Sequence, residues 1–220
     1  DLHSFPTRRS SDLWQRRYPW IWDAETGERY RMKMGGTGFR LELGPAETRL
    51  IVLSREKRGT FWKPLPTGGN NGQSLDEDWE VEFRHSLEGW RKTMHMPALT
   101  DIKDTGFADF TGTAVYRKRV VIQDTKNVYL NLGKVHGVCE LFVNGQSGGV
   151  KWYGRRIYNI APYVSKGENI LEVHVITTME NYMKTLKDNP TAQKFTVLKS
   201  KDQPIQSMGL IGLVTIYRYI

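Results

Sequence analysis

Two glutamates, Glu80 and Glu82, have the residue type and spacing that acid–base chemistry on a glycosidic bond could use. That reaction needs two carboxylates opposed across the sugar, roughly 5 to 10 Å apart, one of them with a raised pKa. Both glutamates alternate with Trp79, Val81 and Phe83, however, which is typical of a strand with one buried and one exposed face. We therefore expect Glu80 and Glu82 to face solvent as solubilising side chains, and we assign no catalytic residue in this chain.

Three aspartates, Asp101, Asp104 and Asp109, lie in a long segment without apolar periodicity, which predicts a loop. Ca²⁺ prefers several oxygen ligands, so these carboxylates could hold a structural calcium ion. Loop carboxylates are also commonly just solvated, and both interpretations stay open. No other cofactor is indicated, because the sequence has no H-E-x-x-H motif and no paired C-x-x-C motif.

Sugar binding requires a flat aromatic face for the C–H groups of the ring and nearby polar groups for its hydroxyls. Trp152, Tyr153, Arg155 and Arg156 provide both chemistries within a few residues. The alternative is that Trp152 fills a hydrophobic core and that both arginines merely face water. We predict these four residues as carbohydrate-binding candidates and leave the alternative open.

The formal net charge of +8 raises the question of nucleic-acid binding. The basic clusters at 16–17, 117–119 and 155–156 lie far apart, with acidic residues between them, so we favour a solvated basic surface and expect no nucleic-acid partner. No segment approaches the roughly 20 apolar residues of a membrane span, and we expect none. Cys139 is the only cysteine, and its apolar surroundings predict a buried small hydrophobe.

Short strands joined by turns are expected to position these residues. The Asn144-Gly145 dipeptide, flanked by alternating apolar residues, predicts a two-residue hairpin because both turn positions need positive φ. A short helix is expected between 178 and 189. The other predicted strands lie within 79–83, 109–122, 128–150, 157–175, 193–198 and 210–219. Strands spaced roughly ten residues apart indicate an all-β sandwich, and an eight-stranded jelly roll fits this pattern.

The chain is expected to divide into four parts. Residues 1–13, DLHSFPTRRSSDL, resemble the translated read-through of a sequencing adapter, so we treat them as a non-native tail with natural protein continuing upstream. Residues 14–57 predict the terminal strands of a preceding β domain. Residues 58–73 are rich in Gly, Pro and Asn, which predicts a linker. Residues 74–220 are expected to form the jelly roll. The three strands expected before the linker lie at 30–34, 39–43 and 49–53.

Four motifs follow one another in the predicted jelly roll: T-G-T-A-V-Y at 111–116, L-F-V-N-G at 141–145, an aromatic strand at 151–153 and K-G-E-N-I-L-E-V at 166–173. This series resembles the sugar-binding, galactose-binding-like jelly-roll domain of glycoside hydrolases of the family 2 type and of the α-L-rhamnosidase type, family 106. The rhamnosidase type fits better, because the W-D-x-x-T-G-E hairpin at 22–28 and the L-G-P strand at 43–52 resemble the β domain that precedes its jelly roll.

The resemblance implies the C-terminal accessory region of an enzyme that hydrolyses O-glycosidic bonds in polysaccharides. The catalytic acids would then lie in a (β/α)₈ barrel upstream, which would be the partner of this region within the parent chain, and the parent would be periplasmic or secreted. Asn181 and Tyr182 occupy the place of an N-x-W-N-R-like loop in such domains and join the carbohydrate-binding candidates, although the sequence here is E-N-Y-M-K. A free-standing carbohydrate-binding module or lectin, without hydrolase activity, is the alternative.

Overall fold

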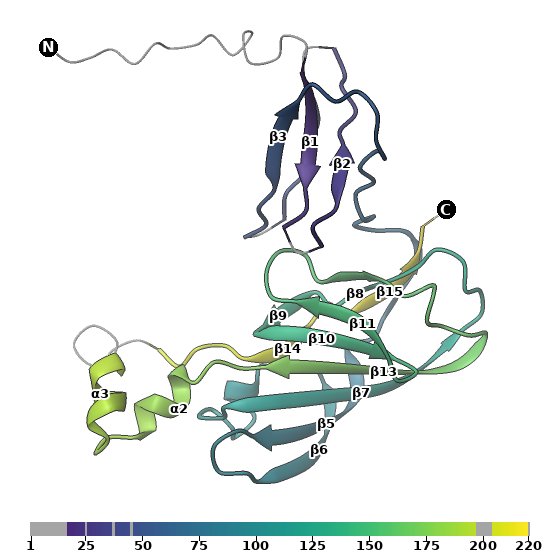
Figure 1. Cartoon of the computed structure of the whole chain (residues 1–220). Helices are drawn as coiled ribbons and strands as arrows, with labels where there is room; N and C mark the ends of the chain where they lie inside the picture. Colours follow the sequence, from purple (N-terminus) through teal and green to yellow (C-terminus); the bar gives the residue numbers. More distant parts are fainter. Residues whose placement is uncertain (1–16, 25, 37, 45, 197–203, 220) are drawn as a thin grey trace, which may run out of the picture. The chain divides into compact units, whose positions relative to one another are not determined.

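The computed structural model describes residues 17–196 and 204–219, except 25, 37 and 45 (Figure 1). The predicted tail at 1–13 therefore lies outside the described residues. The chain separates into two compact units, residues 1–64 and 65–220. The division falls inside the segment predicted as a linker.

The described residues of the first unit form an antiparallel sheet in the order β2-β1-β3. Its strands are β1 (Tyr18–Trp22), β2 (Arg29–Arg31) and β3 (Leu50–Ser54). Trp20 and Ile21 of β1 are buried. The strand expected at 39–43 is wrong: these residues form none, and both Leu41 and Leu43 are exposed, because no neighbouring strand covers their alternating face. The central strand β1 was not predicted from Y-P-W-I-W, a continuous apolar run with no alternation.

The described part of the second unit contains a six-stranded sheet, β11-β10-β13-β7-β5-β6, a four-stranded sheet, β12-β8-β15-β4, and the pair β14-β9, all antiparallel (Figure 1). The strands of the large sheet are β5 (Glu77–His85), β6 (Arg91–Ala98), β7 (Gly112–Ile122), β10 (Val138–Val143), β11 (Gln146–Lys151) and β13 (Gly167–Ile176). The others are β4 (Asn70–Ser74), β8 (Val128–Asn131), β9 (Lys134–His136), β12 (Ile157–Asn159), β14 (Gly209–Gly212) and β15 (Thr215–Arg218).

One hydrophobic core lies between these sheets. The predicted alternation in β5 is confirmed, since Trp79, Val81 and Phe83 are fully buried. Leu130 of β8 and Ile216 of β15 belong to the same core cluster, so the sheets contribute opposing faces to it. The expected all-β sandwich is therefore confirmed, with more strands in the described part of the second unit than the eight that were predicted.

The predicted hairpin joins β10 and β11. Asn144 and Gly145 both have positive φ, 51° and 79°, as the two-residue turn requires. The Asn144 side chain also holds the turn to its neighbours, because its amide donates to the Tyr163 carbonyl at 3.0 Å and accepts the Ile170 N–H at 2.9 Å.

Two short helices follow β13 along the described chain. The helix expected between 178 and 189 is present as α2 (Glu180–Thr185). The strand expected from residue 193 is wrong, because these residues belong to α3 (Pro190–Thr196), and residues 197 and 198 lie outside the described part. Asn189 caps α3 by accepting two backbone N–H groups, and Pro190 suits its first position, so Asn-Pro was the signal for a helix start. No described helix is long and apolar enough to cross a membrane.

Candidate functional site

Trp152 is the most exposed of the aromatic candidates, with 62% of its surface accessible. It directly follows β11, which is an edge strand of the six-stranded sheet. Gly154 has φ 66°, so the chain turns just beyond the aromatic pair. The Tyr153 ring lies 4.5 Å from the Trp152 ring, centroid to centroid, at an interplanar angle of 57°. The indole therefore lies outside the core and, with Tyr153, presents an accessible aromatic surface.

The two neighbouring arginines have different environments. Arg155 is half-exposed and makes no ion pair with any described residue. Arg156 is only 8% exposed, so the alternative in which both arginines merely face water does not hold for this residue. Its Nη1 donates to the Gly154 carbonyl at 2.9 Å, while its buried Nε lacks a hydrogen-bond partner among the described residues.

Cys139, Tyr158 and Lys151 lie together at the end of β11. The Cys139 thiol donates to the Lys151 carbonyl at 3.2 Å and lies 3.4 Å from the Tyr158 hydroxyl. Burial raises the pKa of Cys139, although the Tyr158 hydroxyl and the charges of Arg156 and Lys151 act in the opposite direction. The predicted buried cysteine is confirmed. A protonated, buried thiol is a poor nucleophile.

Asn181 and Tyr182 make structural contacts elsewhere. The buried Asn181 amide donates to the Gln206 carbonyl at 2.9 Å and accepts the Gln206 N–H at 2.8 Å, tying α2 to the chain before β14. The Tyr182 hydroxyl donates to Glu88 at 3.0 Å, and its ring packs against His85. No described hydrogen bond or ring contact joins either residue to Trp152, so the structure does not bring the two candidate groups together through such contacts.

The predicted calcium ligands do not converge. Asp101 is buried and serves as a cap, accepting the N–H of Lys103 at 3.2 Å and of Met208 at 2.9 Å. Asp104 and Asp109 are exposed. Among the residues that the structure describes, no group of three or more His, Cys, Asp or Glu side chains is placed to hold a metal ion.

Glu82 is not the solvated side chain that alternation predicts. Its carboxylate is only 15% exposed and receives hydrogen bonds from Arg84 Nε and Nη2 and from Arg117 Nη1. The Arg84 hydrogen bonds, opposed by burial and aided by Arg117, lower the pKa of Glu82 to about 2. A general acid needs a raised pKa, so Glu82 is unsuited to that role. Glu80 is exposed as expected.

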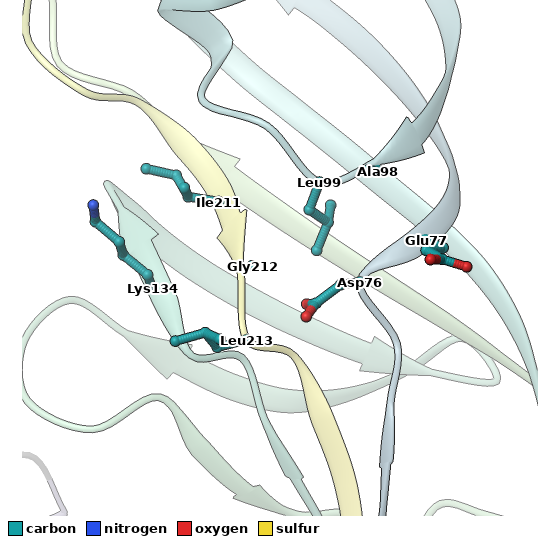
Figure 2. Close-up of a pocket in the computed structure, with 8 residues that line it drawn as sticks. All are labelled: Asp76, Glu77, Ala98, Leu99, Lys134, Ile211, Gly212 and Leu213. Atoms are coloured by element: carbon teal, nitrogen blue, oxygen red, sulfur yellow. The ribbon is translucent and has the colours of Figure 1, made fainter.

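One open hollow of about 310 Å³ lies in the second unit, between the loop before β5 and the turn from β14 to β15 (Figure 2). Its lining is Asp76, Glu77, Ala98, Leu99, Lys134, Ile211, Gly212 and Leu213. The Asp76 carboxylate already accepts the Val214 N–H at 2.7 Å. The Glu77 carboxylate points away from the Asp76 carboxylate (Figure 2). The hollow has no aromatic lining and no opposed carboxylate pair. Its residues therefore offer neither a stacking surface for a sugar nor the two acidic groups that glycoside hydrolysis needs.

The sequence also contains one G-x-S-x-G pattern, Gly145 to Gly149, which in some hydrolases marks a nucleophilic serine. That role needs a sharp strand-to-helix turn and a histidine partner. The pattern here lies in the β10–β11 hairpin, and the Ser147 hydroxyl donates to Glu140 at 3.3 Å. The structural context for a nucleophile is therefore missing from the described residues.

Comparison with known proteins finds similarity to glycoside hydrolases, and no family model matches the chain. A rhamnosidase from Novosphingobium sp. PP1Y superposes with a TM-score of 0.64 at 22% identity, covering 91% of this chain and 20% of that one. A putative β-glucuronidase of Formosa agariphila is 28% identical over 110 residues, which are 47% of this chain and 10% of that protein. A β-D-glucuronidase structure from Dictyoglomus thermophilum is 27% identical over 51% of this chain and 21% of its own, with a TM-score of 0.40.

The likeness to the rhamnosidase shows the fold of this chain. Because the sequence identity is only 22%, it shows nothing beyond the fold. A β-sandwich of this kind occurs within a glycoside hydrolase, and this chain spans about a fifth of that protein's length and a tenth of the curated relative's length.

Proposed function

We propose that the chain is a non-catalytic accessory β region of a glycoside hydrolase, of the α-L-rhamnosidase type, and that its second unit is a galactose-binding-like domain that binds carbohydrate through Trp152 and Tyr153. In this proposal the parent hydrolyses O-glycosidic bonds in polysaccharides outside the cytoplasm. The catalytic barrel of the same parent chain is then the intramolecular partner of this region.

The exposed indole of Trp152 carries the sugar-binding part of the proposal. Leaving a large aromatic side chain in water has an unfavourable solvation free energy that burial in the nearby core would have removed. With Tyr153 beside it, Trp152 offers the flat apolar surface on which the C–H face of a pyranose packs, and the half-exposed Arg155 supplies donors for its oxygens.

The accessory role rests on the carboxylates. The Glu82 carboxylate is hydrogen-bonded to two arginines, and the Asp76 carboxylate is hydrogen-bonded to a backbone N–H. The hollow in Figure 2 has no second carboxylate opposite Asp76. Retaining and inverting mechanisms both need two acidic groups facing one sugar. The coverage of the rhamnosidase likeness agrees with a larger parent, since it uses 20% of that chain.

A glycan array and titration calorimetry with the whole 220-residue chain test this function. We expect binding to at least one polysaccharide class, loss of at least ten-fold in affinity for Trp152→Ala, and no release of the phenol from an aryl glycoside. A silent array, or binding that Trp152→Ala leaves unchanged, would contradict the sugar-binding role. Turnover of an aryl rhamnoside would contradict the non-catalytic role.

A free-standing carbohydrate-binding module is the second candidate, and the same exposed aromatic pair favours it. The two differ in what lies upstream of the described chain. Recovering the natural reading frame distinguishes them: an adjoining barrel with paired Glu residues supports the accessory role, and a different neighbour supports the module.

A further inference from the structure

We propose that the surface around Trp152 and Tyr153 selects an acidic saccharide, one that carries carboxylate or sulfate groups. This inference rests on the proposed sugar-binding function and specifies its ligand class. It depends on the charges that surround the aromatic pair.

Three cations accompany the aromatic pair within six residues: Lys151, Arg155 and Arg156. None of the three forms an ion pair with an acidic side chain in the described part of the chain. Elsewhere in the second unit Arg84, Arg117, Arg119 and Arg218 all have carboxylate partners. The Lys151 ammonium lies over the Tyr158 ring, 5.4 Å from its centroid, but no described carboxylate neutralises the charge at this site, which favours a ligand that brings negative charge.

The polar groups of the site are mostly donors. Guanidinium and ammonium groups donate only, and so does the indole N–H of Trp152. Recognition of a neutral sugar uses acceptors as well, since each hydroxyl also donates a hydrogen bond. The nearest carboxylate on β10, Glu140, accepts from the Ser147 hydroxyl rather than from any of the three cations. Apart from the Tyr153 hydroxyl, which can also accept, the side chains of the site are donors, and this matches a carboxylate or sulfate, which can only accept.

The buried Nε of Arg156 adds a second observation. A buried charged donor without a partner is costly, and an anion or an ordered water that reaches it relieves that cost. Arg156 also lies near Lys151, because both charges lower the pKa of the same Cys139 thiol. Both cations therefore lie near Cys139, while Arg155 is the more accessible of the two arginines.

Matched pairs of polysaccharides test the charge requirement on the whole chain. We expect polygalacturonate to bind at least ten-fold more tightly than its fully methyl-esterified form, or dextran sulfate at least ten-fold more tightly than dextran. The first preference would identify a carboxylate as the recognised group, and the second a sulfate. In either case the affinity should fall as salt rises from about 50 to 500 mM, because salt screens charged contacts.

Variants locate the effect. Arg155→Gln should weaken binding of the preferred anionic polysaccharide about ten-fold, since a charge-assisted hydrogen bond is lost. The exposed Lys166, in the turn before β13, provides the control, and Lys166→Gln removes the same charge with less than a two-fold effect. Thermal unfolding of each variant confirms that it is folded.

Four results would overturn the inference. Equal binding of the charged and neutral polymers would refute it while leaving sugar binding intact, and absence of all polysaccharide binding would refute both proposals. Tighter binding of a single-stranded oligonucleotide than of any polysaccharide would assign the site to nucleic acid instead. Equal losses for Arg155→Gln and Lys166→Gln would show a general charge effect rather than a site.

Discussion

Arg117 Nη1 lies 3.0 Å from Glu82 Oε2, joining β7 to β5 on the outer face of the six-stranded sheet. The same guanidinium donates through Nε to Glu172 on β13, the strand on the other side of β7. Arg117 therefore connects two carboxylates across three strands. Val115, which points to the same outer face, is fully buried. The outer face of this sheet therefore combines a charged network across three strands with a fully buried apolar side chain beside it.

Glu82 should make stability depend on acid pH. Its folded pKa of about 2 is below the ordinary 4.5, so its ionised form stabilises the fold above pH 4.5 and this contribution is lost as pH falls toward 2. We expect Glu82→Gln to lower the free energy of unfolding by about 2 kcal/mol at pH 7 and by much less at pH 3. Urea unfolding at both pH values measures the difference.

Glu80→Gln is the matched control, because Glu80 is exposed on the same strand and forms no ion pair with a described residue. It should change the stability by less than about 0.5 kcal/mol at either pH. An equal loss for Glu82→Gln at pH 7 and pH 3 would show that the stabilisation comes from packing rather than from charge.

Gly145 should contribute to stability only because glycine tolerates the positive φ of the turn. It has φ 79°, and a Cβ added there would meet no atom within 4 Å. Gly145→Ala should therefore destabilise by about 1 kcal/mol without any clash. Gly68→Ala serves as the comparison, because Gly68 has equally open surroundings and no positive φ. A loss of stability in Gly68→Ala as large as that in Gly145→Ala, measured by thermal unfolding, would reject the conformational explanation.

The parts of the fold that the sequence predicts are those set by neighbouring residues. Asn144-Gly145 specifies its turn, and the alternation of Trp79, Val81 and Phe83 specifies the buried face of β5. Where a partner lies far along the chain, local patterns fail. Asp101 was expected to be a loop ligand, since Met208 is 107 residues away. For Glu82 distance explains only part of the difference: Arg117 is 35 residues away, but Arg84, two residues away, donates two of its three hydrogen bonds.

The candidate site, too, could be predicted from the sequence only in part. Aromatic and basic residues at 152–156 predict the chemistry of a surface, but periodicity alone does not decide whether Trp152 is inside or outside, because it follows the end of an edge strand. The sequence likewise gives no indication that Arg156 is buried while Arg155 is half-exposed.

Cys139 should report on opening of the sandwich. It is the only cysteine in the sequence, its side chain is buried in β10, and burial raises its pKa. Because only an accessible thiolate reacts, labelling with an aromatic disulfide at pH 8 should be at least 100-fold slower in buffer than in concentrated urea. Fast labelling in buffer would contradict the buried position. If labelling requires unfolding, its rate in buffer should rise about ten-fold for each 1.4 kcal/mol of stability that Glu82→Gln loses.

Asn181 should prove structural rather than sugar-binding. Its buried amide exchanges two hydrogen bonds with the backbone of Gln206, so Asn181→Ala leaves both a donor and an acceptor without partners. We expect a loss of about 2 kcal/mol in the free energy of unfolding. Tyr182→Phe, which removes only the contact with Glu88 and keeps the ring against His85, should have a much smaller effect, because solvent replaces the lost hydrogen bond. Affinity for the polysaccharide that Trp152 binds should stay within two-fold in both variants. Weaker sugar binding by Asn181→Ala at unchanged stability would instead place α2 in the binding site.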